Sequence, residues 1–257
     1  MAAAGFHQLG SEFANARIAQ VHDKLGRGEA VYLAGLGLPG THNSGVALVE
    51  VTQANGPRLI VNNEEERFSG NKHTTEYPQA SIEAMVKTLR GMGRDIGDIA
   101  AWLTSWDYHA RQLGLLERVP LICMPHHDNH AWFSFAASPF AENEEAVAIS
   151  VLDGTGDLGS ISLYVVENGE MRQLYCNESM SDSLGAFYSV ISSTQGGWTW
   201  LSSEGRYMGA AAWGDMNRAT NPRLKNILHF GHDGESGSTV PLPIGTATRS
   251  TIHTSRH

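Results

Sequence analysis

Three histidines stand within five positions of one another in this chain, at His126, His127 and His130. The first and the last are four residues apart, and on one turn of a helix that spacing directs both side chains to the same side. Two neutral imidazoles placed in this way can chelate a divalent transition-metal ion, usually together with a carboxylate from elsewhere in the chain. Because such pairs also occur by chance on helix surfaces, a plain solvated helix face is the alternative.

The position of this cluster in the chain favours the metal-site interpretation. It directly follows residues 120–124, an apolar run that is typical of a buried strand. In sheets of α/β proteins, ligands bind at the carboxyl ends of strands. We therefore predict that His126 and His130 are metal ligands.

A second group of candidate residues is Asp153, Gly154, Thr155 and Gly156, which follow the apolar residues 146–152. Small residues at such a turn allow backbone N–H groups to approach a phosphate, and the aspartate can hold a metal or a bound water. No Gly-Lys-Ser/Thr follows, so this is not a Walker loop. The alternative is an ordinary hairpin turn, because Asp-Gly is among the commonest hairpin signals.

Two segments of the chain, residues 31–61 and 146–175, share one layout of strand, Gly-rich or polar turn, strand, turn and strand. They begin roughly 115 residues apart, far beyond the ~20–50-residue periods of solenoids, which indicates a long-period duplication. The Gly-rich turn at residues 40–45 takes the same place in the first copy that Asp153–Gly156 take in the second. We expect the two turns to face each other and to hold a nucleotide phosphate between two lobes.

The remaining elements complete an α/β protein with mixed sheets. Hydrophobic spacing predicts helices at residues 11–28, 78–93, 130–137 and 183–193, and buried strands at 100–104 and 120–124. The predicted organisation is a helical extension (1–30), a first lobe (31–145), a partial second lobe (146–230) and an unpatterned tail (231–257) rich in Gly, Ser, Thr and Pro.

Composition excludes several classes of protein. The 257 residues carry 18 basic and 27 acidic side chains, a formal charge of −9, which argues against a protein that chiefly binds nucleic acid. Two cysteines imply no disulfide framework. Without a secretory signal or ~18 consecutive apolar residues, we expect a soluble, cytoplasmic protein that does not interact with membranes.

Six motifs in a fixed order resemble those of the O-carbamoyltransferases that modify nodulation factors and antibiotics. They lie at residues 40–45, 64–68 (followed by Lys72, His73 and Pro78), 126–131, 153–157, 183–189 and 204–210. The resemblance extends from about Tyr32 to Gly214. The repeated lobes with their Gly-rich turns also resemble the superfamily of actin, sugar kinases and heat-shock chaperone ATPases.

This resemblance implies two duplicated actin/sugar-kinase-like lobes, of which the second is incomplete, and an ATP-dependent activity. Such enzymes combine carbamoyl phosphate with ATP into carbamoyl-adenylate and then move the carbamoyl group to a hydroxyl of a small molecule or glycoconjugate. His126 and His130 match the family's metal ligands, with iron as the metal. His42 matches a histidine beside the reacting group, an acid/base or orienting residue. The turn Asp153–Gly156 matches a phosphate-binding turn of the second lobe.

Two departures from the family pattern limit these expectations. Asn43 stands where the family usually has aspartate, and a further metal-ligand aspartate and the adenylate-forming domain lie beyond the matched region. We therefore expect that the chain alone does not catalyse transfer and that it needs a C-terminal adenylate-forming domain or a second copy. A tRNA threonylcarbamoyl transferase and a truncated, non-catalytic binding protein remain alternatives. The acidic balance and the motifs at 64–68 and 204–209 favour small-molecule carbamoyl transfer.

Overall fold

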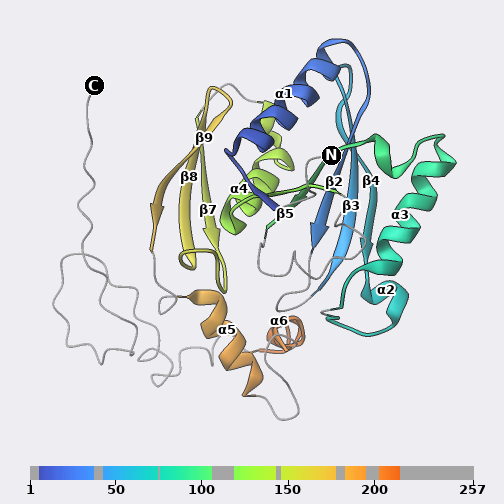
Figure 1. Cartoon of the computed structure of the whole chain (residues 1–257). Coiled ribbons are helices and arrows are strands. Elements are labelled where there is room, and N and C mark those ends of the chain that lie inside the picture. Colours follow the sequence, from blue (N-terminus) through green and yellow to red (C-terminus); the bar gives the residue numbers. More distant parts are fainter. Residues whose placement is uncertain are drawn as a thin grey trace, which may run out of the picture. The chain divides into compact units, whose positions relative to one another are not determined.

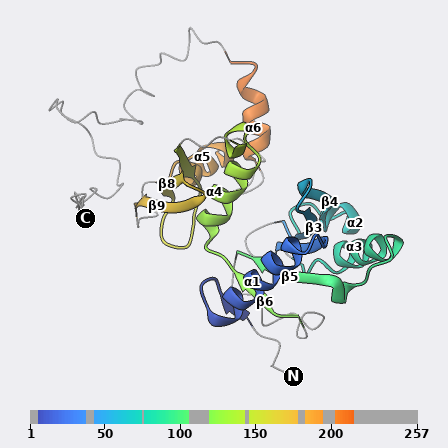
Figure 2. The same ribbon diagram turned by 90° about the horizontal axis from the view of Figure 1, so that it is seen from above.

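The computed structural model describes seven stretches of the chain, and these divide into two units, residues 1–130 and 131–257 (Figures 1 and 2). The described residues are 6–37, 43–74, 76–105, 119–142, 146–177, 183–194 and 203–214. The predictions for His42 and for the tail at 231–257 lie outside these residues. In the described part of the chain, no helix is both long and apolar enough to cross a membrane.

The first unit is built on a six-stranded mixed sheet with the order β1-β6-β5-β2-β3-β4. Neighbours from β1 to β2 run parallel, whereas β2, β3 and β4 form an antiparallel meander. The strands are β1 (Phe6–Gln8), β2 (Val31–Gly37), β3 (Gly45–Thr52), β4 (Gly56–Glu64), β5 (Ile99–Thr104) and β6 (Leu121–Cys123). The mixed α/β class is confirmed. Strand β1 was not predicted, because three residues are too short to show an alternating pattern.

Two long helices pack against this sheet, α1 (Glu12–Gly26) and α3 (Gln79–Gly91). Ser11 caps α1, since its hydroxyl accepts the Ala14 N–H at 3.2 Å. Helix α3 buries Ile82, Met85 and Leu89, and these side chains share one core with the sheet. Met92, which the spacing also assigned to this apolar stripe, is the C-cap residue and is 37% exposed. The other buried members of that core are Tyr32, Ala34, Leu36, Val46, Leu48, Val61, Ile99, Trp102 and Leu121.

The second unit contains a three-stranded antiparallel sheet with the order β7-β8-β9. Its strands are β7 (Val147–Leu152), β8 (Ile161–Glu167) and β9 (Glu170–Cys176), followed by the helices α5 (Leu184–Ser193) and α6 (Glu204–Ala211). Ala131 and Phe135 of α4 (His126–Ala136) pack against Ile149, Val151 and Tyr164 of this sheet. Helix α4 therefore runs across the division between the two units and covers one face of the second sheet.

The predicted start of α4 at His130 was wrong, because the helix begins at His126. The Asn129 N–H donates to the Pro125 carbonyl at 3.1 Å, which gives the helix its first turn. The residues of this turn are polar, so no apolar periodicity marked them as helical.

The two meanders share one irregularity. Their pairing register shifts between the middle and the third strand, at Leu48/Val49 in the first unit and at Leu163/Tyr164 in the second. These positions have the same separation as the two sequence copies. The shared shift supports a duplicated meander, while the complete actin-like lobes stay a prediction.

A charge run such as residues 64–68 usually forms a solvated face, but Glu65 is an exception. Glu65 is 6% exposed, and its carboxylate accepts the N–H groups of Ala80 at 3.1 Å and Ser81 at 2.8 Å. These N–H groups lie in the first turn of α3, where they have no partner within the helix. The Glu65 N–H donates to the Ser44 carbonyl at 3.0 Å. Glu65 thus joins the start of β3 to the start of α3, next to the Gly-rich turn at 40–45.

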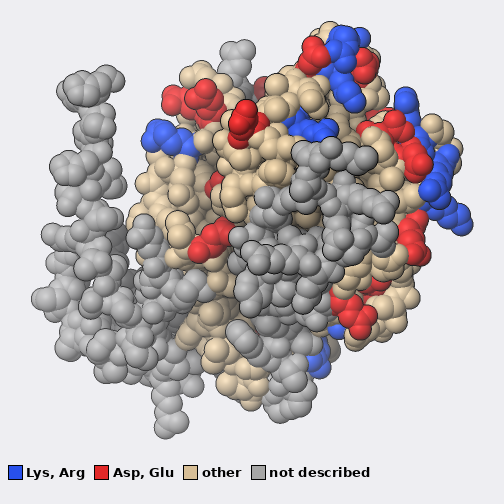
Figure 3. Space-filling model, viewed as in Figure 1, with Lys and Arg blue, Asp and Glu red and all other residues tan. Residues whose placement is uncertain are grey.

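Acidic and basic side chains are interspersed on the face of the molecule shown in Figure 3. One ion pair joins Arg58 of β4 to Glu50 of β3 at 2.8 Å, and Tyr32 donates to the same carboxylate at 2.9 Å. The Arg58 guanidinium lowers the pKa of Glu50. No basic stripe of the kind that tracks a nucleic-acid backbone is visible among the described residues on this face.

Replacing Glu65 by alanine is expected to destabilise the protein by about 1–3 kcal/mol, because the buried N–H of Ser81 and the partly buried N–H of Ala80 lose their acceptor. The matched control is Glu64→Ala, which removes only a surface ion pair with Arg67 at 3.3 Å and is expected to cost less than about 1 kcal/mol. Urea unfolding of both variants measures the difference. Equal stabilities of the two variants would show that Glu65 does not anchor α3.

Tyr77 gives a prediction about alkaline pH. Burial, with the nearby Glu65 carboxylate, raises the pKa of Tyr77 to about 12 from an ordinary value of 10.0. The unfolded chain therefore releases this proton first, so the contribution of Tyr77 to stability is complete below pH 10 and is lost as pH rises through 12. Tyr77→Phe should lose less stability than the wild type between these pH values.

At neutral pH the same variant should lie within about 1 kcal/mol of the wild type, because the Tyr77 hydroxyl has no partner among the described residues. Urea unfolding at pH 8 and pH 11, reported as the difference between variant and wild type, cancels the titration of the other groups. A difference that does not change with pH would contradict the raised pKa.

Candidate metal centre

Strand β6 and the first turn of α4 position the histidine cluster. β6 lies between β1 and β5, and its three residues are buried. The Met124 N–H donates to the Thr104 carbonyl at 2.9 Å, so the chain is still attached to β5 as it leaves β6. The side-chain amide of Asn129 donates to the Pro125 carbonyl at 3.2 Å, which stabilises the first turn of α4. The histidines thus follow the carboxyl end of a strand that is fixed by backbone hydrogen bonds.

The structure brings His126 and His130 together as the spacing predicted. Their Nε2 atoms lie 3.1 Å apart, and the two rings meet edge to face with centroids 4.6 Å apart. When two nitrogens bind the same ion at about 2.1 Å, they lie about 3.0 Å apart in octahedral geometry and about 3.4 Å apart in tetrahedral geometry. The observed separation lies in this range. The pair therefore fits a shared metal ion without rearrangement of the helix.

His127 lies on a different side of the helix. It is 4% exposed, whereas His130 is exposed, and its ring centroid is 6.1 Å from that of His126. His127 and the fully buried Ala131 are four residues apart and share one face of α4. The cluster of three histidines thus separates into two neighbouring rings, His126 and His130, and one buried residue, His127.

The turn after β7 is closed by its own hydrogen bonds. The Asp153 N–H donates to the Ser160 carbonyl at 2.8 Å, and the Gly156 N–H donates to the Gly159 carbonyl at 2.6 Å. The Gly154 N–H donates to the Asp153 carboxylate at 2.5 Å. Two of the amides that could cradle a phosphate are therefore engaged within the turn. A phosphate bound there by these amides would have to replace these bonds.

The described part of the first Gly-rich turn consists of Asn43, Ser44 and Gly45. The Asn43 side-chain oxygen lies 3.1 Å from Nδ1 of His73, and both residues have a positive φ. The His73 N–H donates to Glu66 at 2.9 Å, and this hydrogen bond lowers the pKa of Glu66. The sequence motifs at 40–45 and 64–73 therefore meet, which the sequence did not predict because the contacts are long-range.

Helices α5 and α6 are joined by polar and aromatic contacts. The Ser189 hydroxyl donates to the Glu204 carboxylate, and the rings of Tyr188 and Tyr207 lie 5.5 Å apart. Helix α6 was not predicted, although its residues belong to a recognised motif. Glycines at two of its eight positions weaken the helical signal.

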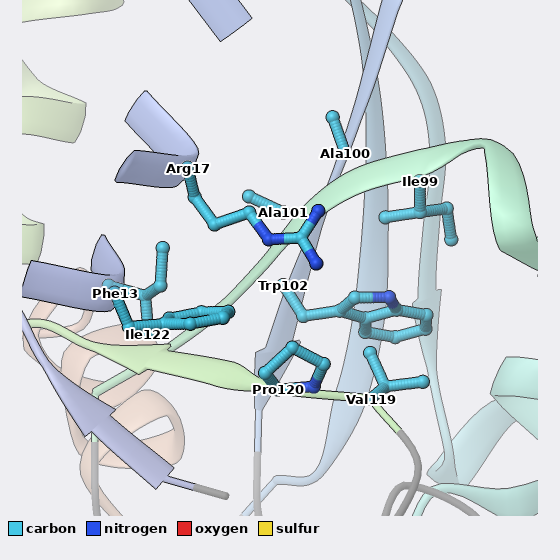
Figure 4. A pocket seen from close by; sticks show the side chains of 9 residues that line it. All are labelled: Phe13, Arg17, Ile99, Ala100, Ala101, Trp102, Val119, Pro120 and Ile122. Atoms are coloured by element: carbon cyan, nitrogen blue, oxygen red, sulfur yellow. The ribbon is translucent and has the colours of Figure 1, made fainter. Parts of the chain in front are cut away.

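A small pocket of about 30 Å³ lies in the first unit between α1 and the strands β5 and β6 (Figure 4). It is lined mainly by apolar side chains such as Phe13, Trp102 and Ile122, while the Arg17 guanidinium lies 5.3 Å from the Phe13 ring. This volume holds about one water molecule. The pocket lacks the carboxylates and histidines that chemistry at a metal needs.

Comparison with known proteins agrees with these motifs. The family model described as carbamoyltransferase N-terminus matches residues 100–236. A protein of Synechocystis sp. that is itself uncharacterized is 26% identical over 237 residues, covering 75% of this chain and 36% of the relative. The chain thus spans about a third of the length of that relative. The family match includes the histidine pair, the turn after β7 and the helices α5 and α6, and extends over more than half of the chain, which therefore belongs to the carbamoyltransferase family and carries its N-terminal region.

Proposed function

We propose that this chain carries the metal-binding part of an ATP-dependent O-carbamoyltransferase. In this reaction, carbamoyl phosphate and ATP give carbamoyl-adenylate, and the carbamoyl group then passes to a hydroxyl of a small molecule or glycoconjugate. The observation that carries the proposal is the His126–His130 pair, whose ring nitrogens lie 3.1 Å apart inside the family match. The step that makes the adenylate belongs, in this proposal, to a further part of the enzyme.

We further propose Asp153 as the carboxylate ligand that accompanies the two histidines. Each of the three side chains offers one ligand atom. The Gly154 N–H holds one carboxylate oxygen of Asp153, as outer hydrogen bonds commonly orient metal ligands. Because the amides of Gly154 and Gly156 are engaged within the turn, a ligand role suits Asp153 better than a phosphate cradle. Two histidines and one carboxylate with open positions are typical of ferrous iron.

In this proposal, the bound metal, its histidine ligands and His42 have different chemical roles. A bound metal would polarise the carbamoyl carbonyl and stabilise the negative charge of the tetrahedral intermediate. To bind the metal, Nε2 of His126 and of His130 must carry no proton, and its lone pair is then used for the metal. These nitrogens therefore cannot accept the proton of the acceptor hydroxyl. That role stays a prediction for His42. Asn43, the next residue in the sequence, lies with its side-chain oxygen 3.1 Å from Nδ1 of His73, and the His73 N–H donates to Glu66.

The metal proposal predicts that a His126→Ala/His130→Ala variant binds at least about 100-fold less ferrous iron than the wild type, because both imidazole ligands are gone. Asp153→Ala should weaken binding at least about tenfold. The control is His22→Ala, which removes an exposed imidazole of α1. Anaerobic reconstitution, desalting and elemental analysis give the metal content. Equal iron in all four proteins would overturn the site.

The transfer proposal predicts that the metal is near the carbamoyl group. Cobalt(II), a paramagnetic substitute for iron, should broaden the carbonyl resonance of ¹³C-labelled carbamoyl phosphate more strongly in the presence of the wild type than of the His126→Ala/His130→Ala variant. Inorganic phosphate is the control ligand, and its ³¹P resonance separates recognition of phosphate from recognition of the carbamoyl group. Broadening that is identical with both proteins would contradict a role of this metal in carbamoyl transfer.

A further inference from the structure

Helix α5 begins directly against the turn that carries Asp153. Its N-cap, Ser183, is 5% exposed, and its hydroxyl oxygen accepts the Ala186 N–H at 2.9 Å. The same hydroxyl lies 2.7 Å from the Gly154 carbonyl oxygen and 3.0 Å from the Asp153 carbonyl oxygen. Its one proton lies within hydrogen-bond distance of both oxygens. A single side chain therefore caps the helix and holds two successive carbonyls of the turn.

The second residue of α5, Gly185, packs backbone to backbone on the same turn. A Cβ atom at Gly185 would lie 2.6 Å from the Gly154 nitrogen, 2.7 Å from its Cα and 2.9 Å from the Asp153 carbonyl carbon. These contacts are closer than van der Waals contact allows, and all three atoms belong to the backbone. Only glycine fits this position while the turn keeps its place.

The atoms that Gly185 touches also orient the Asp153 carboxylate. The Gly154 nitrogen carries the N–H that donates to this carboxylate, and it is the atom nearest to the added Cβ. On the other side of the turn, the Asp153 N–H is fixed to Ser160 of the hairpin. The peptide between Asp153 and Gly154 is thus held by the hairpin on one side and by α5 on the other.

We infer that Ser183 and Gly185 are positioning residues that fix the Asp153 carboxylate for metal binding. The inference rests on the proposed role of Asp153 as a ligand and adds the start of α5 to the site. Ser183 acts by its hydrogen bonds to the turn, and Gly185 acts by the absence of a side chain. It also gives the motif at residues 183–189 a physical role, since two of its members support the metal ligand.

The test compares Gly185→Ala with Gly205→Ala. Both glycines are the second residue of their helix, but an added Cβ at Gly205 meets nothing within 4 Å. Hydrogen–deuterium exchange of the metal-free protein reports on the turn, and a cobalt(II) titration reports on the ligand. We expect Gly185→Ala to speed exchange in residues 152–160 about tenfold and to weaken cobalt binding about 10- to 100-fold, the range typical of lost outer contacts. Gly205→Ala should change neither quantity.

Ser183 provides a second variant in case Gly185→Ala does not fold, which circular dichroism would show. Ser183→Ala should shift both readouts in the same direction, and Ser183→Thr, which keeps the hydroxyl, should restore them. Unchanged exchange in Gly185→Ala and Ser183→Ala would overturn the inference. So would faster exchange with unchanged cobalt affinity, if Asp153→Ala abolishes cobalt binding. Equal cobalt binding by the wild type and Asp153→Ala would instead refute the ligand role, while exchange still decides whether α5 holds the turn.

Discussion

The distance of 3.1 Å between the Nε2 atoms of His126 and His130 restricts what the first turn of α4 can do. At this separation the two nitrogens cannot both carry a hydrogen, because two donors would face each other. Either one proton lies between the rings or a cation with two coordination positions takes its place. Neutral imidazole nitrogens are good ligands for transition metals, so this separation is compatible with a bound ion as well as with a hydrogen bond.

Backbone contacts position the candidate residues within each unit. β6 is paired on both sides, and the Met124 N–H continues the pairing toward β5 before the helix begins. In the second unit, the peptide after Asp153 is held between the hairpin and the glycine of α5. Backbone contacts of this kind leave little freedom for the chain, because a displacement breaks several of them together. In the proposed function, side chains on such supports would be preorganised and would not have to be ordered when a metal binds.

Much of the fold follows from local patterns in the sequence. The spacing of apolar residues predicted α3, and the strands of both meanders lie where short apolar runs between turn residues placed them. The histidine pair was predicted because residues four apart on a helix always meet. Strand β1 and helix α6 were missed, since one is too short and the other too rich in glycine for a periodic signal. The Glu65 contact could not be predicted, because nothing local distinguishes the acidic residue that turns inward from its two neighbours. The turn at Asp153–Gly156 was assigned to phosphate from its small residues, its place in the repeat and the family resemblance, and only the structure shows which partners its amides have.

X-ray absorption at the iron edge of the reconstituted protein can decide whether the first turn of α4 binds the metal. We predict one iron per chain whose first coordination shell contains nitrogen and oxygen, with the multiple-scattering signature of two imidazoles. In the His126→Ala/His130→Ala variant, that imidazole signature should vanish together with the bound iron. A spectrum without imidazole scattering, or one that is unchanged in the variant, would show that the metal is held elsewhere and that the first turn of α4 is not its site.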